Sequence, residues 1–221
     1  GRLLLHCFAG CKFEDIISCV QKNNKRNYIP IYENRNLNRF PKNDLSNVNI
    51  FNIWNNSNPI LKHSPIDIYL RDRNLSNYRL ASDLRYHPKL YLNGNYYHAL
   101  IAGVNYLGTI TAIHRTFIYS NGKAVTYNNG KKYKKSWGKL KGGAIRLVNN
   151  NPSNLYVSEG IESALSYMKI HINYIGDKSI WAGISASNMM NLQLPSKAGN
   201  LHLIPDNDPT GLSASYHLME R

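Results

Sequence analysis

Residues 154–165 read Asn-Leu-Tyr-Val-Ser-Glu-Gly-Ile-Glu-Ser-Ala-Leu, and residues 201–211 read Leu-His-Leu-Ile-Pro-Asp-Asn-Asp-Pro-Thr-Gly. In each stretch a short β-prone run ends in carboxylates and a glycine, and a helical pattern follows. Strand, acidic turn and helix, repeated with a crossover between them, describe a βαβ unit. Because ligands of such sheets bind beyond the carboxyl ends of the strands, we expect Glu159, Asp206 and Asp208 to converge on one site.

These three carboxylates suit a hard divalent cation. Mg²⁺ takes oxygen ligands, and it commonly combines one or two carboxylates with phosphate oxygens and waters. Asp206 and Asp208 are two residues apart, so on extended backbone both side chains leave the same face. An alternative stays open, because Asp-Asn-Asp-Pro-Thr-Gly is also common turn chemistry, and Glu159 and Glu162 also favour a helix N-terminus.

A family resemblance rests on the same residues. Glu159-Gly160 followed by Asp206-x-Asp208 resembles the Toprim domain of bacterial primases, topoisomerases and some nucleases. The form Ser-Glu-Gly-Ile-Glu-Ser-Ala-Leu at residues 158–165 is most similar to the Toprim-containing primases of phages, plasmids and integrated elements. The resemblance implies phosphoryl transfer that depends on Mg²⁺ or Mn²⁺, with Glu159 as metal ligand or acid–base group and the two aspartates as metal ligands. Toprim domains usually carry further acidic positions downstream, so we expect this one to be incomplete at its C-terminal end.

Two thiols lie four residues apart near the start of the chain, in the stretch His-Cys-Phe-Ala-Gly-Cys at residues 6–11. A structural zinc site takes four ligands, so Cys7 and Cys11 alone also fit incidental thiols. The stretch is similar to the second half of the zinc ribbon that precedes the catalytic core of these primases. The resemblance therefore implies that Cys7 and Cys11 form half of a Zn²⁺ site, which only a longer chain would complete.

The charge of the chain is unevenly distributed. The formal net charge is +14, with 27 Lys and Arg against 13 Asp and Glu. Residues 151–221 hold four of the basic and six of the acidic residues, so residues 1–150 hold 23 and seven, a net charge of +16. A basic body beside an acidic metal site suits an enzyme that handles a polyphosphate, although a basic protein with a solvated surface has the same composition.

The middle of the chain predicts an α+β body. Residues 64–73 fit a helix with Ser64 as its N-cap and Pro65 in its first turn. Three β-prone runs follow at residues 96–104, 110–119 and 144–148, and a lysine-rich loop separates the last two. The pattern indicates an antiparallel sheet with one helix packed on it.

The same resemblance extends over this body. The stretches Tyr-Leu-Arg-Asp-Arg-Asn-Leu, Leu-Arg-Tyr-His-Pro, Ala-Ile-His-Arg-Thr-Phe and Lys-Gly-Gly-Ala-Ile-Arg-Leu resemble segments that precede Toprim in mobile-element primases. Arg115 offers a guanidinium fork for phosphate, and Lys141 beside two glycines lets backbone N–H groups approach an anion. Arg115 could instead pair with a core acid, and the glycines could form only a hairpin turn. We also count Arg71, Arg73 and Arg85 as candidates for nucleotide or nucleic-acid contact.

Four segments summarise the expected organisation: a zinc-ribbon remnant (1–20), a basic linker (21–57), a primase α+β subdomain (58–150) and a Toprim α/β domain (151–221). No run of about 18 apolar residues suggests a membrane span.

The resemblance implies a DNA primase, a nucleotidyltransferase of DNA replication. It would join ribonucleoside triphosphates on a single-stranded DNA template in the bacterial cytoplasm, at the nucleoid, with a replicative helicase as a further partner. We expect the chain as given to be inactive or very weak by itself. A Toprim nuclease or topoisomerase-like enzyme, or an inactive DNA-binding remnant of a mobile-element primase, are the alternatives.

Overall fold

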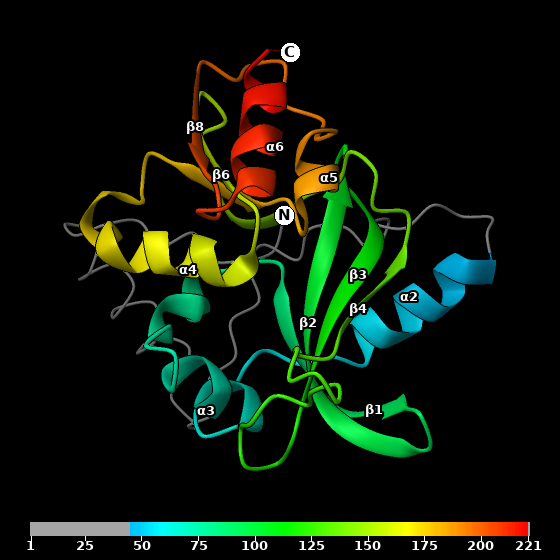
Figure 1. Cartoon of the computed structure of the whole chain (residues 1–221). Helices are drawn as coiled ribbons and strands as arrows, with labels where there is room; N and C mark the ends of the chain where they lie inside the picture. The colour runs from blue at the N-terminus through cyan, green and yellow to red at the C-terminus, as the bar shows by residue number, and fades with distance from the viewer. Residues whose placement is uncertain (1–44, 221) are drawn as a thin grey trace, which may run out of the picture. The chain divides into compact units, whose positions relative to one another are not determined.

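The computed structural model describes residues 45–220, and Cys7 and Cys11 lie outside this range (Figure 1). The described residues form two four-stranded sheets with helices packed against them. The elements, in chain order, are α2 (Leu45–Asn55), α3 (Pro65–Arg71), the 3₁₀ helix η1 (Ser76–Leu80), β1 (Leu84–Leu92), β2 (Asn95–Tyr106), β3 (Thr109–Ile118), β4 (Lys134–Gly138), β5 (Ile145–Asn149), β6 (Asn154–Ser158), α4 (Ile161–Ile170), the 3₁₀ helix η2 (Ile172–Tyr174), β7 (Ser179–Ala182), α5 (Ala186–Met189), β8 (Asn200–Ile204) and α6 (Pro209–Met219).

The first sheet is antiparallel throughout, with the strand order β1-β2-β3-β4. Successive residues of a strand point to opposite faces, so each strand contributes to two hydrophobic clusters. On one face Ile101 of β2 packs with Ile50 and Trp54 of α2. On the other face Leu100 packs with Ile66 of α3. The predicted helix is confirmed, since Ser64 Oγ accepts a hydrogen bond from the N–H of Asp67 and Pro65 begins α3.

Part of the predicted linker, and part of the predicted lysine-rich loop, form regular secondary structure. Residues 45–55 form helix α2, and the side chains of Ile50 and Trp54 are buried. The surrounding asparagine-rich sequence contains few apolar residues, so it masked this short amphipathic pattern. Part of the lysine-rich segment forms β4, an edge strand, where exposed lysines are common because only one side of the strand is paired. Strand β1 is a further strand that the sequence analysis missed.

The second sheet has the order β5-β7-β6-β8, with β6 parallel to both of its neighbours and β5 antiparallel to β7. Strand β5 was expected in the first sheet, but it pairs here. Alternate residues of β6 and β7 face opposite sides. Leu155 and Trp181 pack with Leu218 of α6, whereas Ile180 packs with Leu165 of α4. Helices therefore cover both faces, which confirms an α/β unit after an antiparallel body.

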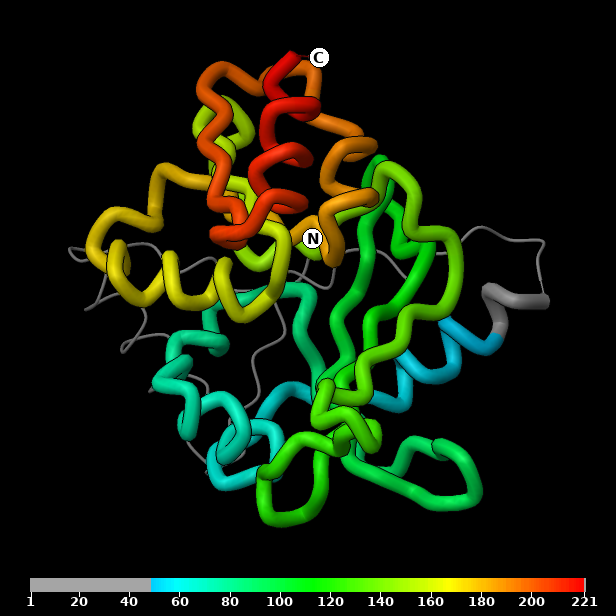
Figure 2. The backbone as a smooth tube through the Cα atoms, in the orientation of Figure 1, coloured from blue at the N-terminus to red at the C-terminus, as the bar shows by residue number. Residues whose placement is uncertain are grey.

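The two sheets share one hydrophobic cluster, which runs from α3 through β2 to α4 and β5. A buried asparagine adds polar contacts at their junction. The side-chain amide of Asn188 donates to the carbonyls of Gly143 and Gly183, both at 2.8 Å, and its oxygen accepts from the N–H of Gly142 at 3.3 Å. The backbone path through this junction can be followed in Figure 2. Within residues 45–220, no helix has the length and hydrophobicity to span a bilayer.

Candidate active site

The predicted acidic residues follow two adjacent parallel strands. Ser158 of β6 pairs with Ile204 of β8, so Glu159 and Asp206 leave the sheet at the same edge. The segment that follows β7 is hydrogen-bonded to the chain at this edge. The N–H of Ile184 donates to the carbonyl of Glu159 at 2.7 Å. Ile184 has φ of +79°, a left-handed conformation that a β-branched residue seldom adopts and that often marks a functional site.

The turn after β8 orients the two aspartates differently. Asp206 Oδ1 accepts a hydrogen bond from the hydroxyl of Ser163, in the first turn of α4, at 3.0 Å. Asp208 is the N-cap of α6, and its Oδ1 accepts from the N–H of Gly211 at 2.8 Å. A Cβ on Gly211 would lie 2.6 Å from the carbonyl oxygen of Asp206, so the turn requires glycine there. One oxygen of Asp208 is thus engaged by its own helix.

The charges of the three carboxylates meet at Glu159. Partial burial raises the pKa of Glu159, and the negative charges of Asp206 and Asp208 raise it further, while a hydrogen bond from the N–H of Ala186 acts in the opposite direction. Across residues 45–220, no three His, Cys, Asp or Glu side chains are close enough to form a ready-made metal cluster. The oxygen-only donor set and the mutual repulsion nevertheless fit a hard divalent cation that also takes ligands from water and phosphate.

A fourth carboxylate, Glu162, lies three residues after Glu159 and connects the second sheet to the first. Glu162 Oε1 accepts a hydrogen bond from Tyr69 of α3 at 2.5 Å and one from Lys132 Nζ at 2.7 Å. Lys134 Nζ lies 3.5 Å from Oε2, and Arg73 Nε lies 3.6 Å from Oε1. Three cations therefore surround one carboxylate, and we call Tyr69, Arg73, Lys132, Lys134 and Glu162 the Glu162 cluster.

The Glu162 cluster is strongly polarised. Burial raises the pKa of Glu162, but the hydrogen bonds from Lys132 and Tyr69 and the two lysine charges outweigh this and lower it to about 2. The pKa of Tyr69 is raised well above its ordinary value by burial and by Glu162, so its hydroxyl stays protonated as a donor. The guanidinium of Arg73 also lies over the Tyr69 ring, 3.9 Å from its centroid. The cluster thus holds its cations close to the turn that carries Glu159.

His114 of β3 lies near the lysines of the Glu162 cluster. Burial, and then the positive charges of Lys134 and Arg115, lower its pKa to about 4. Its Nδ1 is 2.8 Å from the hydroxyl oxygen of Ser136. A neutral, hydrogen-bonded imidazole suits a structural role for His114.

The other predicted basic residues are spread over the body. Arg115 points to the face opposite His114 and donates to the carbonyl of Lys135 at 3.3 Å. Arg85 donates to the carbonyl of Trp54 at 2.9 Å and lies 4.1 Å from the centroid of its ring, so it also stabilises the packing of α2. Lys141 is exposed, but the N–H groups of the next two glycines already donate within the protein.

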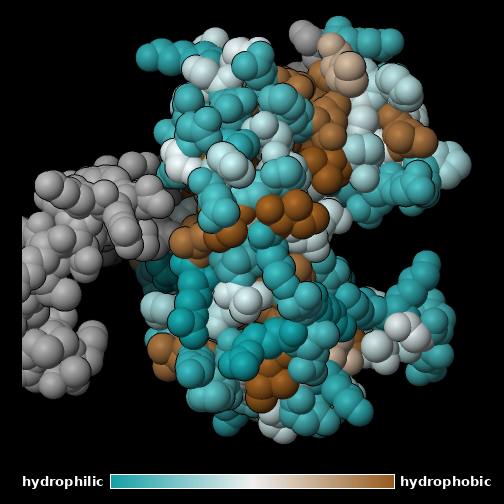
Figure 3. Space-filling model, turned by 90° about the vertical axis from the view of Figure 1, so that its left-hand side faces the viewer, coloured by the Kyte–Doolittle hydropathy of each residue, from teal (hydrophilic) through white to brown (hydrophobic). Residues whose placement is uncertain are grey.

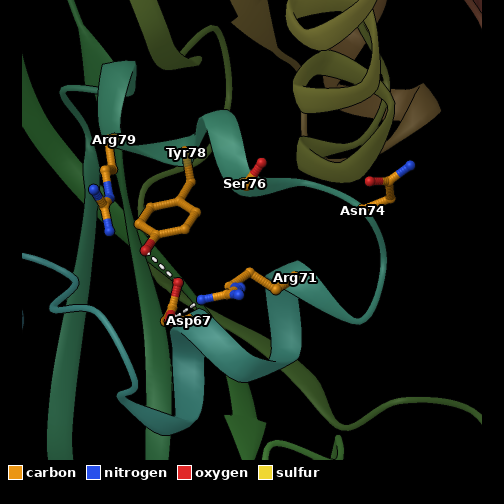
Figure 4. A pocket seen from close by; sticks show the side chains of 6 residues that line it. All are labelled: Asp67, Arg71, Asn74, Ser76, Tyr78 and Arg79. Carbon is orange, nitrogen blue, oxygen red and sulfur yellow. Dashed lines mark hydrogen bonds and ion pairs between the residues drawn. The ribbon is translucent and has the colours of Figure 1, made fainter.

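Arg71 lines a separate pocket. This pocket has a volume of about 460 Å³, and its lining residues are Asp67, Arg71, Asn74, Ser76, Tyr78 and Arg79. Figure 4 shows the carboxylate of Asp67 between the hydroxyl of Tyr78 and the guanidinium of Arg71. The Tyr78 hydroxyl donates to Asp67 Oδ1 at 2.6 Å, and Arg71 Nη1 lies 3.6 Å from Asp67 Oδ2. Because Asp67 already partners Arg71, the pocket is not a purely cationic phosphate site. Of the predicted basic residues, Arg73 is the one that the structure brings to the Glu162 cluster.

The side of the molecule that carries α3 and α4 is mostly hydrophilic, with hydrophobic side chains in small patches (Figure 3). Exposed apolar residues in this part of the chain include Ile170 and Ile172, at the end of α4 and the start of η2.

Two family matches cover most of the described residues. Residues 46–147 match a domain of unknown function (DUF7146), and residues 154–221 match the Toprim domain. No curated protein matches the chain. The second match confirms the Toprim domain that the acidic motifs predicted.

Nine chains of solved structures also match. One is the primase fragment of the bacteriophage T7 primase-helicase protein, at 13% identity and a TM-score of 0.45 over 90% of this chain and 71% of that chain. Another comes from bacteriophage T7 lagging-strand DNA polymerase interacting with primase domains of two gp4 subunits bound to an RNA/DNA hybrid and dTTP. Its identity is 13% and its TM-score 0.43, over 74% of each chain.

Proposed function

Residues 154–221 are a Toprim domain, and from this premise we propose that the chain is the catalytic core of a DNA primase of the phage, plasmid or integrated-element type. The proposed reaction joins ribonucleoside triphosphates on a single-stranded DNA template. One observation supports it above the others: the acidic edge of the second sheet and the cations of the Glu162 cluster meet at the first turn of α4, because Glu159 and Glu162 are three residues apart. Nucleotidyl transfer needs both, carboxylates for a metal and cations for a triphosphate.

Mg²⁺ or Mn²⁺ would be held by Glu159, Asp206 and Asp208. When bound, the cation would neutralise the triphosphate and stabilise the charge that develops during displacement. Asp206 keeps its orientation through Ser163, and Asp208 keeps one oxygen beyond the one that caps α6. A cation here would also relieve the repulsion that raises the pKa of Glu159.

The protein's own cations would bind and orient the nucleotide. Lys132 and Lys134 are paired with Glu162 in this structure. A triphosphate carries more negative charge than one carboxylate, so it would compete with Glu162 for both lysines. Residues 84–158 contain eleven Lys and Arg and no Asp or Glu, so the body also presents a positive field to a nucleic-acid backbone.

A primer-synthesis assay tests the proposal. The protein tested carries this chain, extended by the zinc ligands and the final acidic strand that the Toprim primase resemblance implies. With single-stranded DNA, ribonucleoside triphosphates and Mg²⁺ it should make short RNA. Glu159→Gln should abolish synthesis and leave DNA affinity unchanged, because it removes a charge from the acidic edge and none from the basic body. DNA cleavage without any RNA product would reject the primase in favour of a nuclease.

Metal binding can be tested on the chain itself. Mg²⁺ or Mn²⁺ should raise its melting temperature, because a ligand that binds only the folded state stabilises it. Asp206→Asn with Asp208→Asn should remove this rise, and asparagine preserves the N-cap of α6, so the fold is retained. Glu220→Gln, at the far end of α6, is the matched control. A double variant that responds to metal as strongly as the parent would place the metal site elsewhere.

A further inference from the structure

Residues 132–137, which lead into β4, present different side chains on the two faces of the first sheet. Lys132 and Lys134 contact Glu162, and Ser136 contacts His114. The intervening residues, Tyr133, Lys135 and Trp137, point to the other face of the sheet, because side chains alternate along a strand. The face turned away from the Glu162 cluster is therefore built by residues that the proposed reaction does not use.

Aromatic rings form a continuous row on that face. Tyr97 of β2 contacts Tyr119 and Phe117, with ring centroids 5.6 and 6.4 Å apart. Phe117 contacts Tyr133 at 5.9 Å, and Tyr133 stacks on Tyr127 at 4.1 Å. The row crosses the strands, and its ends are open to solvent, with Tyr119 45% and Tyr127 41% exposed.

Cations lie between these rings. The guanidinium of Arg115 is 5.8 Å from the Phe117 centroid and 5.3 Å from that of Trp137, whose side chain is 36% exposed. Lys135 Nζ lies 5.1 Å from the Tyr133 centroid. We call Tyr97, Arg115, Phe117, Tyr119, Tyr127, Tyr133, Lys135 and Trp137 the aromatic face.

A cavity of about 460 Å³ opens beside the stacked tyrosines, and its lining residues are Asn93, Thr126, Tyr127, Asn128, Asn129 and Tyr133. Its lining carries no charged side chain. Asparagine amides donate and accept hydrogen bonds, as the edges of nucleobases require, and tyrosine rings offer a surface on which a base can stack. The cavity thus combines both contacts that hold an unpaired base.

We propose that the aromatic face binds single-stranded DNA, with one base stacked on Tyr127 in the cavity and a second base stacked on Trp137. Stacked bases need exposed rings, and a phosphate backbone needs cations without nearby acids. Tyr127 and Trp137 are 41% and 36% exposed, and Arg115 and Lys135 lie beside the rings in a segment, residues 84–158, that contains no Asp or Glu. The choice of DNA over RNA rests on the proposed function, in which the template is DNA.

Tryptophan fluorescence offers a direct test on the chain itself. Of its three tryptophans, Trp54 and Trp181 are each only 3% exposed, so Trp137 should report base stacking. An oligo-dT of twelve nucleotides should quench the emission, and Trp137→Phe should remove most of the quenching while DNA still binds. In fluorescence anisotropy, Tyr127→Ala with Trp137→Ala should weaken oligo-dT affinity about tenfold or more. Tyr216→Ala, an exposed tyrosine on α6, is the matched control and should change nothing.

Several outcomes would overturn the inference. These are unchanged affinity in a double variant whose circular dichroism matches the parent, equal quenching in Trp137→Phe, or equal affinity for duplex DNA of the same length. Equal or tighter binding of oligo-rU would reject the commitment to DNA. The readout is independent of catalysis, so oligo-dT binding through this face, together with no primer from the extended protein, would reject the primase while retaining the stacking surface.

Discussion

Glu162 shows how much of the site depends on a single carboxylate. It accepts hydrogen bonds from α3 and from the segment before β4, while its own backbone belongs to α4. Partly buried cations without a partner are costly, so this carboxylate holds Lys132 and Arg73 in defined positions beside the Toprim edge. Without this carboxylate, the positive charges of Arg73, Lys132 and Lys134 would lie close together and repel each other.

The first prediction concerns the acid sensitivity of this group. Its folded pKa of about 2 lies below the ordinary value of 4.5, so its contribution is fully present above that value and is lost as the pH falls through 2. Glu162→Gln should lower the free energy of unfolding by about 1–3 kcal/mol at pH 7. The difference from the parent should shrink steadily between pH 5 and pH 2. Urea unfolding across this pH range measures it, with Glu220→Gln as the control, and a pH-independent difference would contradict the assignment.

The residues of the candidate site were predictable to different degrees. Glu159, Asp206 and Asp208 follow β-prone runs at fixed positions, so local sequence was enough to select them. The structure places them at one edge but turns Asp208 into its own helix, a detail set by the Asp208–Gly211 hydrogen bond. From local sequence Glu162 indicates only a helix start, because its partners lie 28 to 93 residues away. The absence of Asp and Glu from residues 84–158 was the one sequence signal that Lys132 and Lys134 pair with an acid elsewhere in the chain.

At the scale of elements, tertiary packing determines the structure of several segments whose composition does not predict it. Helix α2 has no acidic residue in its first turn and no basic residue in its last, and its neighbourhood is asparagine-rich. Its place is fixed by Ile50 and Trp54 against the first sheet, and by Arg85 stacked on Trp54. The antiparallel body and the βαβ unit were predictable because their strands are long or strongly apolar. Edge strands β4 and β5 were missed or misassigned, since pairing partners rather than local propensity define them.

The second prediction tests whether α2 is part of the folded body. Trp54→Ala should lower the free energy of unfolding by about 3–5 kcal/mol, because it empties a buried aromatic site under the sheet. Tyr216→Ala, which removes an aromatic side chain that is 66% exposed, should change it by no more than about 0.5 kcal/mol. Urea denaturation followed by circular dichroism compares the two. Equal, small effects would restore the linker interpretation of residues 45–55.

At the scale of the whole molecule, charge is segregated along the chain. Eleven cations and no acids occupy residues 84–158, and most acids of the C-terminal segment lie near α4 and α6. Such separation produces a long-range positive field over this segment, which attracts a polyanion. The uneven charge along the chain was predictable from sequence. Which basic residues lie on each face of the first sheet follows only from the strand register.

The third prediction follows from this field. Affinity for single-stranded DNA should fall at least about tenfold between 50 and 200 mM salt, because phosphate contacts release counterions. Lys139→Glu with Lys141→Glu should flatten this dependence, since both lysines are exposed on the positive segment. Lys169→Glu with Lys197→Glu makes the same charge change in the Toprim domain and should leave the slope nearly unaltered. Salt-insensitive binding by the parent chain would contradict the proposed role of the field.

The alternation along residues 132–137 restricts how this gene segment can change length. Adding or deleting one residue before β4 would exchange the two faces, moving Lys134 to the aromatic face and Tyr133 toward Glu162. Insertions or deletions of two residues would preserve the alternation. Homologous chains that keep both surfaces should therefore differ in this segment by even numbers of residues, a parity rule that a set of related sequences can check.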